Sequence, residues 1–411
     1  MILGKAVNVV LNSVTPTWTR PELVSTMPVI TGSGQSVSPE KSKNVATAYR
    51  CGNILSDDVA KMPLQTFVSR RPGEIERVRP NGRLKNIAYR LERKPNRWWS
   101  PFLFKKMAIQ WLLYWGNALI WMPPSGNREM FLLPINQTQP LMDVNANLWF
   151  MTRFRGDPLP TPIPAVEVLH LMINPDESGM WGRSIITYAR ETIGRQLSAY
   201  AMQNTLYKQG LSAAGILWLD GESKPEMRTK VREMYEETMS GYDNNSRIAI
   251  LDKKVSKFEA ITMKPVDVQF LQGMQQNDAE VANYFGMPLH KINLGKQSYE
   301  SNTAQQLDYL STTVDPYLVQ WEDGAETQWL TEEEQEYTYF RFERSALLRT
   351  DPKSRGEYLN GAINNGRLTP NEGRQIEDRP ADLNPAANKL YMPSNIQPMG
   401  ESQQGAKTNA Q

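Results

Sequence analysis

Carboxylates and tryptophans gather in one stretch of the sequence, WEDGAETQW, between Trp321 and Trp329. A glycosidase needs two carboxyl groups that face each other across a cleft. Glu322 and Glu326 are four residues apart, so a helix would place them together on one face, which is typical of a solvated surface. A glycoside-binding or glycoside-hydrolysing protein that uses Glu322 and Glu326 beside Trp321 and Trp329 is therefore an alternative hypothesis for the function.

Other residues that commonly carry chemistry are scarce, with two histidines and one cysteine, Cys51. His170 lies inside an apolar strand pattern, which favours a hydrogen-bonded core histidine, and His290 has no cysteine or histidine partner for a zinc site. The sequence NLGKQS ends like a phosphate-binding loop, but the first glycine of that motif would fall on His290. We expect no catalytic residue, metal or cofactor, and we predict that the protein is not an enzyme.

The overall charge also restricts the function. The chain has 46 Lys and Arg against 44 Asp and Glu, a net charge of +2, whereas domains that bind nucleic acid tightly are usually clearly basic. The single cysteine excludes an intrachain disulfide and suits a reducing compartment. Eleven tryptophans and 19 methionines favour extensive packing surfaces, including surfaces between chains.

The most apolar stretch is WLLYWGNALIWM at 111–122. A membrane-spanning helix needs roughly 20 apolar residues, and the helix-stopping pair Gly116-Asn117 interrupts this shorter run. The stretch therefore predicts a helix, a stop and a strand in the core of a folded domain, and we expect no contact with a membrane.

Hydrophobic periodicity predicts an α+β protein. In the first half, Ser38-Pro39 opens a helix at 40–61, a hairpin follows at 64–79, and the further elements are helices at 84–92 and 101–115 and strands at 118–122, 129–134, 148–156 and 166–172. The second half predicts helices at 185–209, 266–285 and 303–330, a strand at 336–343, and two helices that begin at Pro352 and at the capping box TPNE, 369–372. A small module at 211–262 predicts a strand at 213–219, a charged helix at 223–239 and a strand at 247–252.

The helix at 303–330 has the clearest pattern. Its apolar residues repeat at spacings of three and four, namely Leu307, Leu310, Val314, Tyr317, Trp321, Ala325 and Trp329. Pro316 lies midway and predicts a kink, because proline removes one backbone hydrogen bond and crowds the preceding turn.

The order of these pieces resembles the portal proteins of tailed double-stranded-DNA bacteriophages, specifically the compact portal family of long-tailed phages. The matching stretches are AYRCGNILSDDVAKMPL (48–64), KPN (94–96), WGNALI (115–120), VLHLMINPDESGMWGRSII (168–186), LYKQGLSAAGIL (206–217), AEVANYFGMPLHKI (279–292), YESNTAQQLDYLSTTVDPYL (299–318) and RSALLRTDPKSRGEYLNGAINNGRLTPNEGR (344–374). The family often has a glycine-rich stretch near 381–386, where this chain has ADLNPA.

The resemblance implies a mixed wing domain, a helical stem with a small α/β clip insertion, a long kinked spine helix and a helical crown, in a subunit of a closed ring. The implied boundaries are a 1–39 N-terminal arm or linker, a 40–184 wing to which the 336–343 strand returns, a 185–210 stem helix, a 211–262 clip, a 263–289 stem helix, a 290–302 tunnel loop, a 303–335 spine helix, a 344–381 crown and a 382–411 flexible tail.

The implied function is a ring of twelve subunits at one capsid vertex, through which double-stranded DNA is packaged and ejected. The implied partners are further copies of the chain, the terminase large subunit, the major capsid protein or scaffold, and head–tail connector or adaptor proteins. Such a protein is found in the virion, and in the host bacterial cytoplasm during assembly.

A DNA conduit must screen phosphate charge without holding it, so its surface should combine few cations with many neutral polar groups. No Lys or Arg occurs between Val266 and Leu289, and the following loop has only Lys291 and Lys296. The candidate DNA-tunnel contacts are Gln269, Gln272, Gln276, Lys291, Lys296 and Gln297. An ordinary solvated helix face explains the glutamines equally well.

Overall fold

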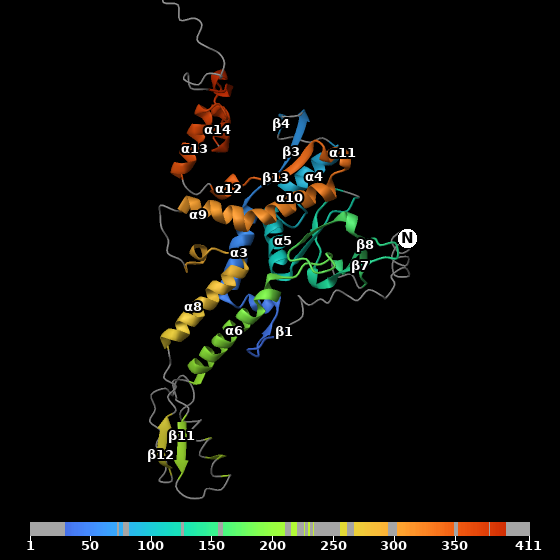
Figure 1. The fold of residues 1–411 in the computed structure, drawn as a ribbon. Coiled ribbons are helices and arrows are strands. Elements are labelled where there is room, and N and C mark those ends of the chain that lie inside the picture. The colour runs from blue at the N-terminus through green and yellow to red at the C-terminus, as the bar shows by residue number, and fades with distance from the viewer. Residues whose placement is uncertain are drawn as a thin grey trace, which may run out of the picture. The chain divides into compact units, whose positions relative to one another are not determined.

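The computed structural model describes residues 29–71, 74–76, 82–124, 127–154, 159–209, 215–219, 226, 229–230, 233, 255–260, 267–294, 302–348, 352–377 and 379–391. The chain divides into two compact units, 1–343 and 344–411. Figure 1 shows the elements of both units.

The described chain combines helices with antiparallel sheets, in agreement with the α+β prediction. The longer helices are α3 (Ala46–Lys61), α4 (Gly82–Glu92), α5 (Pro101–Trp115), α6 (Ile185–Gln209), α8 (Asp267–Tyr284), α9 (Asn302–Tyr309), α10 (Asp315–Trp329), α13 (Pro352–Asn364) and α14 (Pro370–Ile376). The shorter helical segments are α2 (Pro39–Ser42), η1 (Ile135–Gln137), η3 (Ala165–Glu167), η5 (Leu289–Ile292), η7 (Leu310–Val314), α11 (Glu332–Gln335), α12 (Ser345–Leu348) and η8 (Pro385–Asn388).

The strands of the first unit form three three-stranded sheets and two two-stranded ones. The strands are β1 (Val29–Ile30), β2 (Ser36–Val37), β3 (Leu64–Arg71), β4 (Glu74–Glu76), β5 (Asn117–Trp121), β6 (Phe131–Leu132), β7 (Thr138–Met142), β8 (Leu148–Thr152), β9 (Thr161–Pro164), β10 (Val168–Met172), β11 (Gly215–Leu219), β12 (Val255–Ala260) and β13 (Thr338–Phe342). The strand orders are β13-β3-β4, β10-β5-β6, β7-β8-β9, β1-β2 and β11-β12. Strand β13 therefore pairs with β3, from which some 270 residues separate it in the sequence.

The helix, stop and strand predicted for the most apolar stretch are confirmed. The Ser100 hydroxyl accepts a hydrogen bond from the Leu103 N–H, and Pro101 occupies the first turn of α5. At the other end Gly116 has φ of 83°, the left-handed conformation that glycine adopts without strain. Strand β5 follows directly and is buried over its first four residues.

Packing of α5 against α3 forms much of the core of the first unit. Tyr114 is fully buried there and its hydroxyl donates to the Ala48 carbonyl at 3.0 Å. The ring lies so close to Gly52 that a Cβ at that position would be 2.3 Å from the Tyr114 hydroxyl oxygen. Gly52 is therefore required by the close approach of the two helices.

The region predicted as one helix at 40–61 is two helices, and that prediction is wrong at residues 43–45. Ser38 caps α2 as expected, but Val45 is extended, with φ of −85° and ψ of 115°, and completely buried. β-branched residues favour extended backbone. Burial of the Val45 side chain stabilises this conformation more than continuing the helix would.

The chain from residue 382 onward is the segment predicted to be a flexible tail. The described chain continues to residue 391 and includes η8. Asn371 of α14 donates to the Asp382 carbonyl at 3.0 Å and to Asn388 Oδ1 at 2.7 Å. A single asparagine therefore binds this segment at two points, and the flexible tail stays a prediction.

The module predicted at 211–262 is described only in part. The predicted strand at 213–219 is confirmed at 215–219, which form β11, and residues 213–214 lie outside the described residues. The partner of β11 is β12, whose mixed pattern VSKFEA was not predicted as a strand. The predicted helix at 223–239 is helical at the residues described, which are Glu226, Thr229, Lys230 and Glu233. The predicted strand at 247–252 lies outside the described residues.

Across the described ranges, no helix is long and apolar enough to cross a membrane.

Two glycines in helix interiors give a matched stability test. Gly52→Ala should lower the free energy of unfolding by about 1–2 kcal/mol, since overpacking against Tyr114 exceeds the gain of about 0.5–1 kcal/mol that alanine brings to a helix. In α8, a Cβ at Gly273 would meet nothing within 4 Å, so Gly273→Ala should raise the free energy by up to about 1 kcal/mol. Urea unfolding followed by tryptophan fluorescence measures both, and equal effects would contradict the packing described.

Candidate functional site

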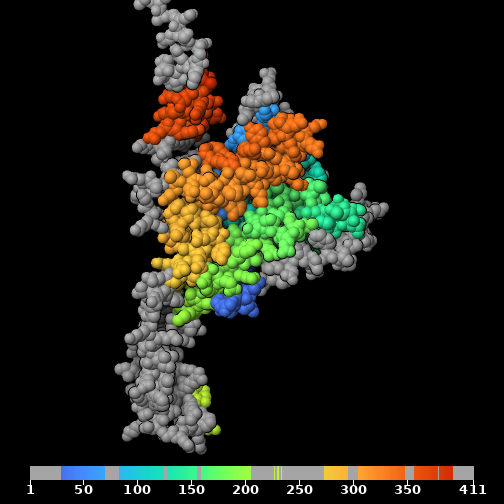
Figure 2. Space-filling view, in the orientation of Figure 1, coloured from blue at the N-terminus to red at the C-terminus, as the bar shows by residue number. Residues whose placement is uncertain are grey.

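Helix α8 carries three of the six residues predicted to face DNA, and polar contacts hold it and α6 together. They lie side by side (Figure 1). Arg195 of α6 and Glu280 of α8 form an ion pair at 2.6 Å, and the Thr192 hydroxyl donates to the same carboxylate at 3.3 Å. N-terminal residues, coloured blue, lie beside α6 in Figure 2, and β2 contacts this helix.

Asp278 of α8 joins three helices. Its Oδ1 accepts hydrogen bonds from the Thr47 hydroxyl of α3 and from the Gln196 side-chain amide of α6, the latter at 2.5 Å. Gln196 and Thr47 are both buried. Hydrogen bonds to an ionised acceptor are stronger than neutral ones, so Asp278 sets the rotation of α8 about its own axis relative to α3 and α6.

The predicted DNA contacts are placed unevenly. Gln276 is exposed on α8. Gln269 and Gln272 belong to the same helix, but their side chains lie outside the described residues, as do Lys296 and Gln297. The structure therefore gives surroundings for Gln276 and Lys291 alone among these six.

Lys291 is half-buried in η5. Its ammonium lies 4.5 Å from the centroid of the Tyr309 ring, a cation–π contact. Its carbonyl accepts a hydrogen bond from the Arg50 guanidinium at 3.2 Å. The Lys291 side chain is therefore held against α9, and this contact fixes the position of its ammonium charge.

Tyr309 connects α9 to α3 in the core. Its hydroxyl donates to Asp58 Oδ2 at 3.1 Å, and Lys61 pairs with Oδ1 of the same carboxylate at 3.1 Å. Burial and the Asp58 charge raise the pKa of Tyr309 far above its usual range, so the phenol stays neutral and remains a donor. Neither Asp58 nor Tyr309 was singled out in the sequence, because the contact joins residues 251 positions apart.

The helix predicted at 303–330 is irregular just before Pro316. Residues Leu310–Val314 form a π-helical turn between α9 and α10, and Pro316 occupies the first turn of α10. Proline cannot donate the backbone hydrogen bond of a continuous α-helix. The Thr313 hydroxyl donates to the Gly286 carbonyl at 2.7 Å, which fixes this turn to the end of α8.

The carboxylates Glu322 and Glu326 do not form a glycosidase site, and they do not lie on a solvated face. Glu322 is buried and accepts a hydrogen bond from the Phe342 N–H at 2.6 Å. Glu326 accepts from the Phe340 N–H at 2.9 Å and from Arg341 at 2.6 Å. Both carboxylates bind the backbone of β13, because it leaves these N–H groups without a strand partner on that side.

The two tryptophans of this stretch are core residues. Trp321 and Trp329 are almost fully buried, and Trp321 packs edge-on against Phe342, with ring centroids 6.1 Å apart. They are not available to stack on a sugar, so the glycoside hypothesis has no support.

The surroundings of the two histidines follow from the fold. His170 Nε2 lies 2.9 Å from Asn117 Oδ1, and burial lowers the pKa of His170 to about 4, so the ring is neutral. This confirms the prediction of a core histidine. Desolvation lowers the pKa of His290. Within the part of the chain that the structure describes, no three His, Cys, Asp or Glu side chains could hold a metal ion.

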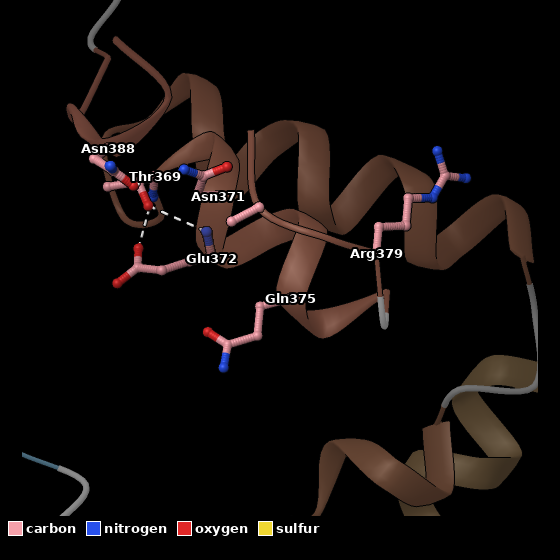
Figure 3. A pocket seen from close by; sticks show the side chains of 7 residues that line it. Thr369, Asn371, Glu372, Gln375, Arg379 and Asn388 are labelled. Carbon is pink, nitrogen blue, oxygen red and sulfur yellow. Dashed lines mark hydrogen bonds between the residues drawn. The ribbon is translucent and has the colours of Figure 1, made fainter. Parts of the chain in front are cut away.

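A cavity of about 580 Å³ lies in the second unit (Figure 3). The polar residues that line this cavity have structural roles. Thr369 and Glu372 form the predicted capping box of α14, and Asn371 holds the returning chain as described above. We therefore assign no chemistry to this cavity.

Comparison with known proteins identifies the family of this chain. The family model of the phage portal proteins matches residues 46–378. The chain belongs to the phage portal protein family. The probable portal protein of Streptomyces phage phiC31 is 25% identical to it over 90% of this chain and 82% of that protein.

Solved portal structures share the fold. A phage portal protein of the HK97 family from Corynebacterium diphtheriae aligns with a TM-score of 0.55 and 16% identity, over 79% of this chain and 99% of that one. A chain in the neck of a native gene transfer agent particle, computed with C12 symmetry, aligns with a TM-score of 0.54 and 16% identity, over 93% of this chain and 100% of that one. The portal fold is thus the frame in which α6, α8 and α10 are held.

The structural role of Glu322 can be separated from a chemical role. Glu322→Ala leaves the buried Phe342 N–H without an acceptor, which should lower the free energy of unfolding by about 2–3 kcal/mol. Asp323, its exposed neighbour, is the matched control, and Asp323→Ala should change the free energy by no more than about 0.5 kcal/mol. Urea unfolding measures both. A loss at Glu322 no larger than at Asp323 would contradict the assigned role.

Proposed function

We propose that this portal-family chain forms a closed ring of twelve subunits at one capsid vertex, through which double-stranded DNA is packaged and ejected. The family match over residues 46–378 carries the proposal. Ring symmetry is supported by the C12 symmetry of the gene transfer agent neck that contains a chain of similar fold. The ring acts as a conduit rather than as an enzyme.

The parts of the chain take the family's roles. Residues 40–184 are the wing, to which the segment 336–343 with β13 returns. Residues 185–210 with α6 and 263–289 with α8 are the stem, 211–262 the clip, and 290–302 the tunnel loop. The segment 303–335 is the spine and 344–381 the crown. In support, β13 pairs with β3, and α10 packs on β10 and β13, so the spine is part of the same folded body as the wing.

The DNA-facing surface is the side of α8 that carries Gln276, with Gln269 and Gln272, together with Lys291, Lys296 and Gln297 after it. A ring with many exposed cations in each subunit would bind the phosphates too tightly to let them move. The absence of Lys and Arg from 266 to 289 agrees with this requirement, and Asp278 keeps the rotation of α8 fixed.

The partners follow from this position in a particle. The clip would meet the terminase large subunit during packaging and head–tail connector or adaptor proteins afterwards, and the wing would meet the major capsid protein or scaffold. The protein would be in the virion after assembly and in the host bacterial cytoplasm before it.

The ring itself is the first test. Twelve copies of the 46.9 kDa chain give a particle of about 560 kDa, which light scattering distinguishes from a single chain. Negative-stain microscopy should show a central hole. A purified chain that stays a monomer under capsid-assembly conditions would contradict the proposal.

The channel face is tested by adding charge to it. Gln276→Lys in every subunit should make duplex binding tighter, and should steepen the slope of log affinity against log salt by about one unit for each added phosphate contact. Asn145 is also exposed but lies in the turn between β7 and β8, so Asn145→Lys is the control and should leave the slope unchanged. Fluorescence anisotropy of a labelled duplex measures it. Equal slopes for the two variants would show that α8 does not face DNA.

A further inference from the structure

A strongly basic segment runs from α4 into the first turns of α5. Between residues 82 and 106 the sequence has eight Lys or Arg and one acidic residue, Glu92, in a chain whose net charge is +2. Glu92 is already engaged, since it accepts a hydrogen bond from the Thr66 N–H at 3.0 Å. The positive charge is therefore concentrated here.

Six exposed side chains of this segment form what we call the basic–aromatic surface: Arg93, Lys94, Arg97, Trp98, Phe102 and Leu103. Trp98 is 52% exposed, Phe102 42% and Leu103 41%. The three cations form no ion pair with any residue that the structure describes. Nearby carboxylates have other partners, since Glu129 pairs with Arg90 at 3.9 Å and Asp57 with Lys106 at 2.7 Å.

Buried Asn96 fixes the backbone of this surface at Trp98. Its Oδ1 accepts hydrogen bonds from the N–H groups of Trp98 and Trp99, both at 2.9 Å, and its Nδ2 donates to the Met130 carbonyl at 2.8 Å. The Trp98 ring lies 5.7 Å from that of Phe131, centroid to centroid. The Arg97 guanidinium lies 5.4 Å from the centroid of the Trp98 ring. A surface ordered before binding loses little conformational entropy on binding.

The combination of exposed aromatic and aliphatic side chains with adjoining cations is that of a protein-binding site. Protein interfaces are enriched in aromatic residues and arginine, and Trp and Arg are frequent among the residues that dominate affinity. Duplex DNA would engage the cations through its phosphates and would leave Phe102 and Leu103 exposed. Charge complementarity then requires an acidic partner.

This chain's own terminal segments are unsuitable partners. Residues 1–28 contain one acidic residue, Glu22, and residues 392–411 contain only Glu401. We infer that the basic–aromatic surface binds an acidic segment with apolar anchors that belongs to another protein of the particle. The inference rests on the proposed role of the chain in a particle.

Photo-crosslinking in assembled particles tests the inference. Phe102 is replaced by benzoylphenylalanine, the particles are irradiated, and crosslinked peptides are sequenced by mass spectrometry. The matched control carries the same probe at Tyr358 of α13, which is 65% exposed in the second unit. We expect position 102, and not position 358, to crosslink to a net-negative, apolar-containing segment of a different protein. Crosslinks to another copy of this chain, to nucleic acid or to lipid, or no crosslink at all, would overturn the inference.

Charge reversal tests the electrostatic part. Arg93→Glu combined with Arg97→Glu should lower the crosslink yield by about tenfold or more. Lys41→Glu combined with Lys389→Glu, at two exposed lysines elsewhere, should leave it within about twofold. Should the first pair not fold, Arg93→Gln with Arg97→Gln replaces it, with a smaller expected loss.

Ring formation is measured by light scattering in every variant. If the Arg93 and Arg97 variants form intact rings and their crosslink yield is unchanged, the inference alone is overturned. If the unsubstituted chain forms no rings, the proposed function is overturned.

Discussion

The orientation of α8 depends on the hydrogen bonds that the Asp278 carboxylate accepts. It accepts hydrogen bonds from Thr47 of α3 and Gln196 of α6, so three helices share one acceptor. Arg195 and Glu280 add a second link between α6 and α8. In the proposed ring, any rotation of α8 would be repeated in every copy, and the surface that we propose to face DNA would turn away from the channel.

Helix α10 is fixed in the same way, because charged side chains bind groups of the backbone. Glu322 and Glu326 accept from N–H groups of β13, and the Thr313 hydroxyl binds the Gly286 carbonyl. Buried backbone groups must find hydrogen-bond partners, and side chains supply them where strands and helices leave gaps. This explains why a carboxylate-rich stretch that could suggest chemistry is structural.

Local signals in the sequence predicted a large part of the fold. Ser38, Ser100 and the Thr369–Glu372 capping box open helices as expected, since a cap depends on neighbouring residues alone. The break at Val45, strand β12 and the contacts of Asn371 with Asp382 and Asn388 were not predicted, because each depends on contacts between segments that are apart in the sequence. The same applies to the site: the contacts of Asp278, Asp58 and Tyr309 could not be predicted, because each joins distant segments, and the DNA contacts named from the sequence stay predictions.

The central claim is that the hole enclosed by the ring does the work, and genome packaging tests it most directly. Phage lacking this chain should assemble heads that contain no nuclease-protected genome, and supplying the chain in trans should restore full heads. Quantification of protected DNA per head gives the answer. Heads filled to the normal level without the chain would contradict the account.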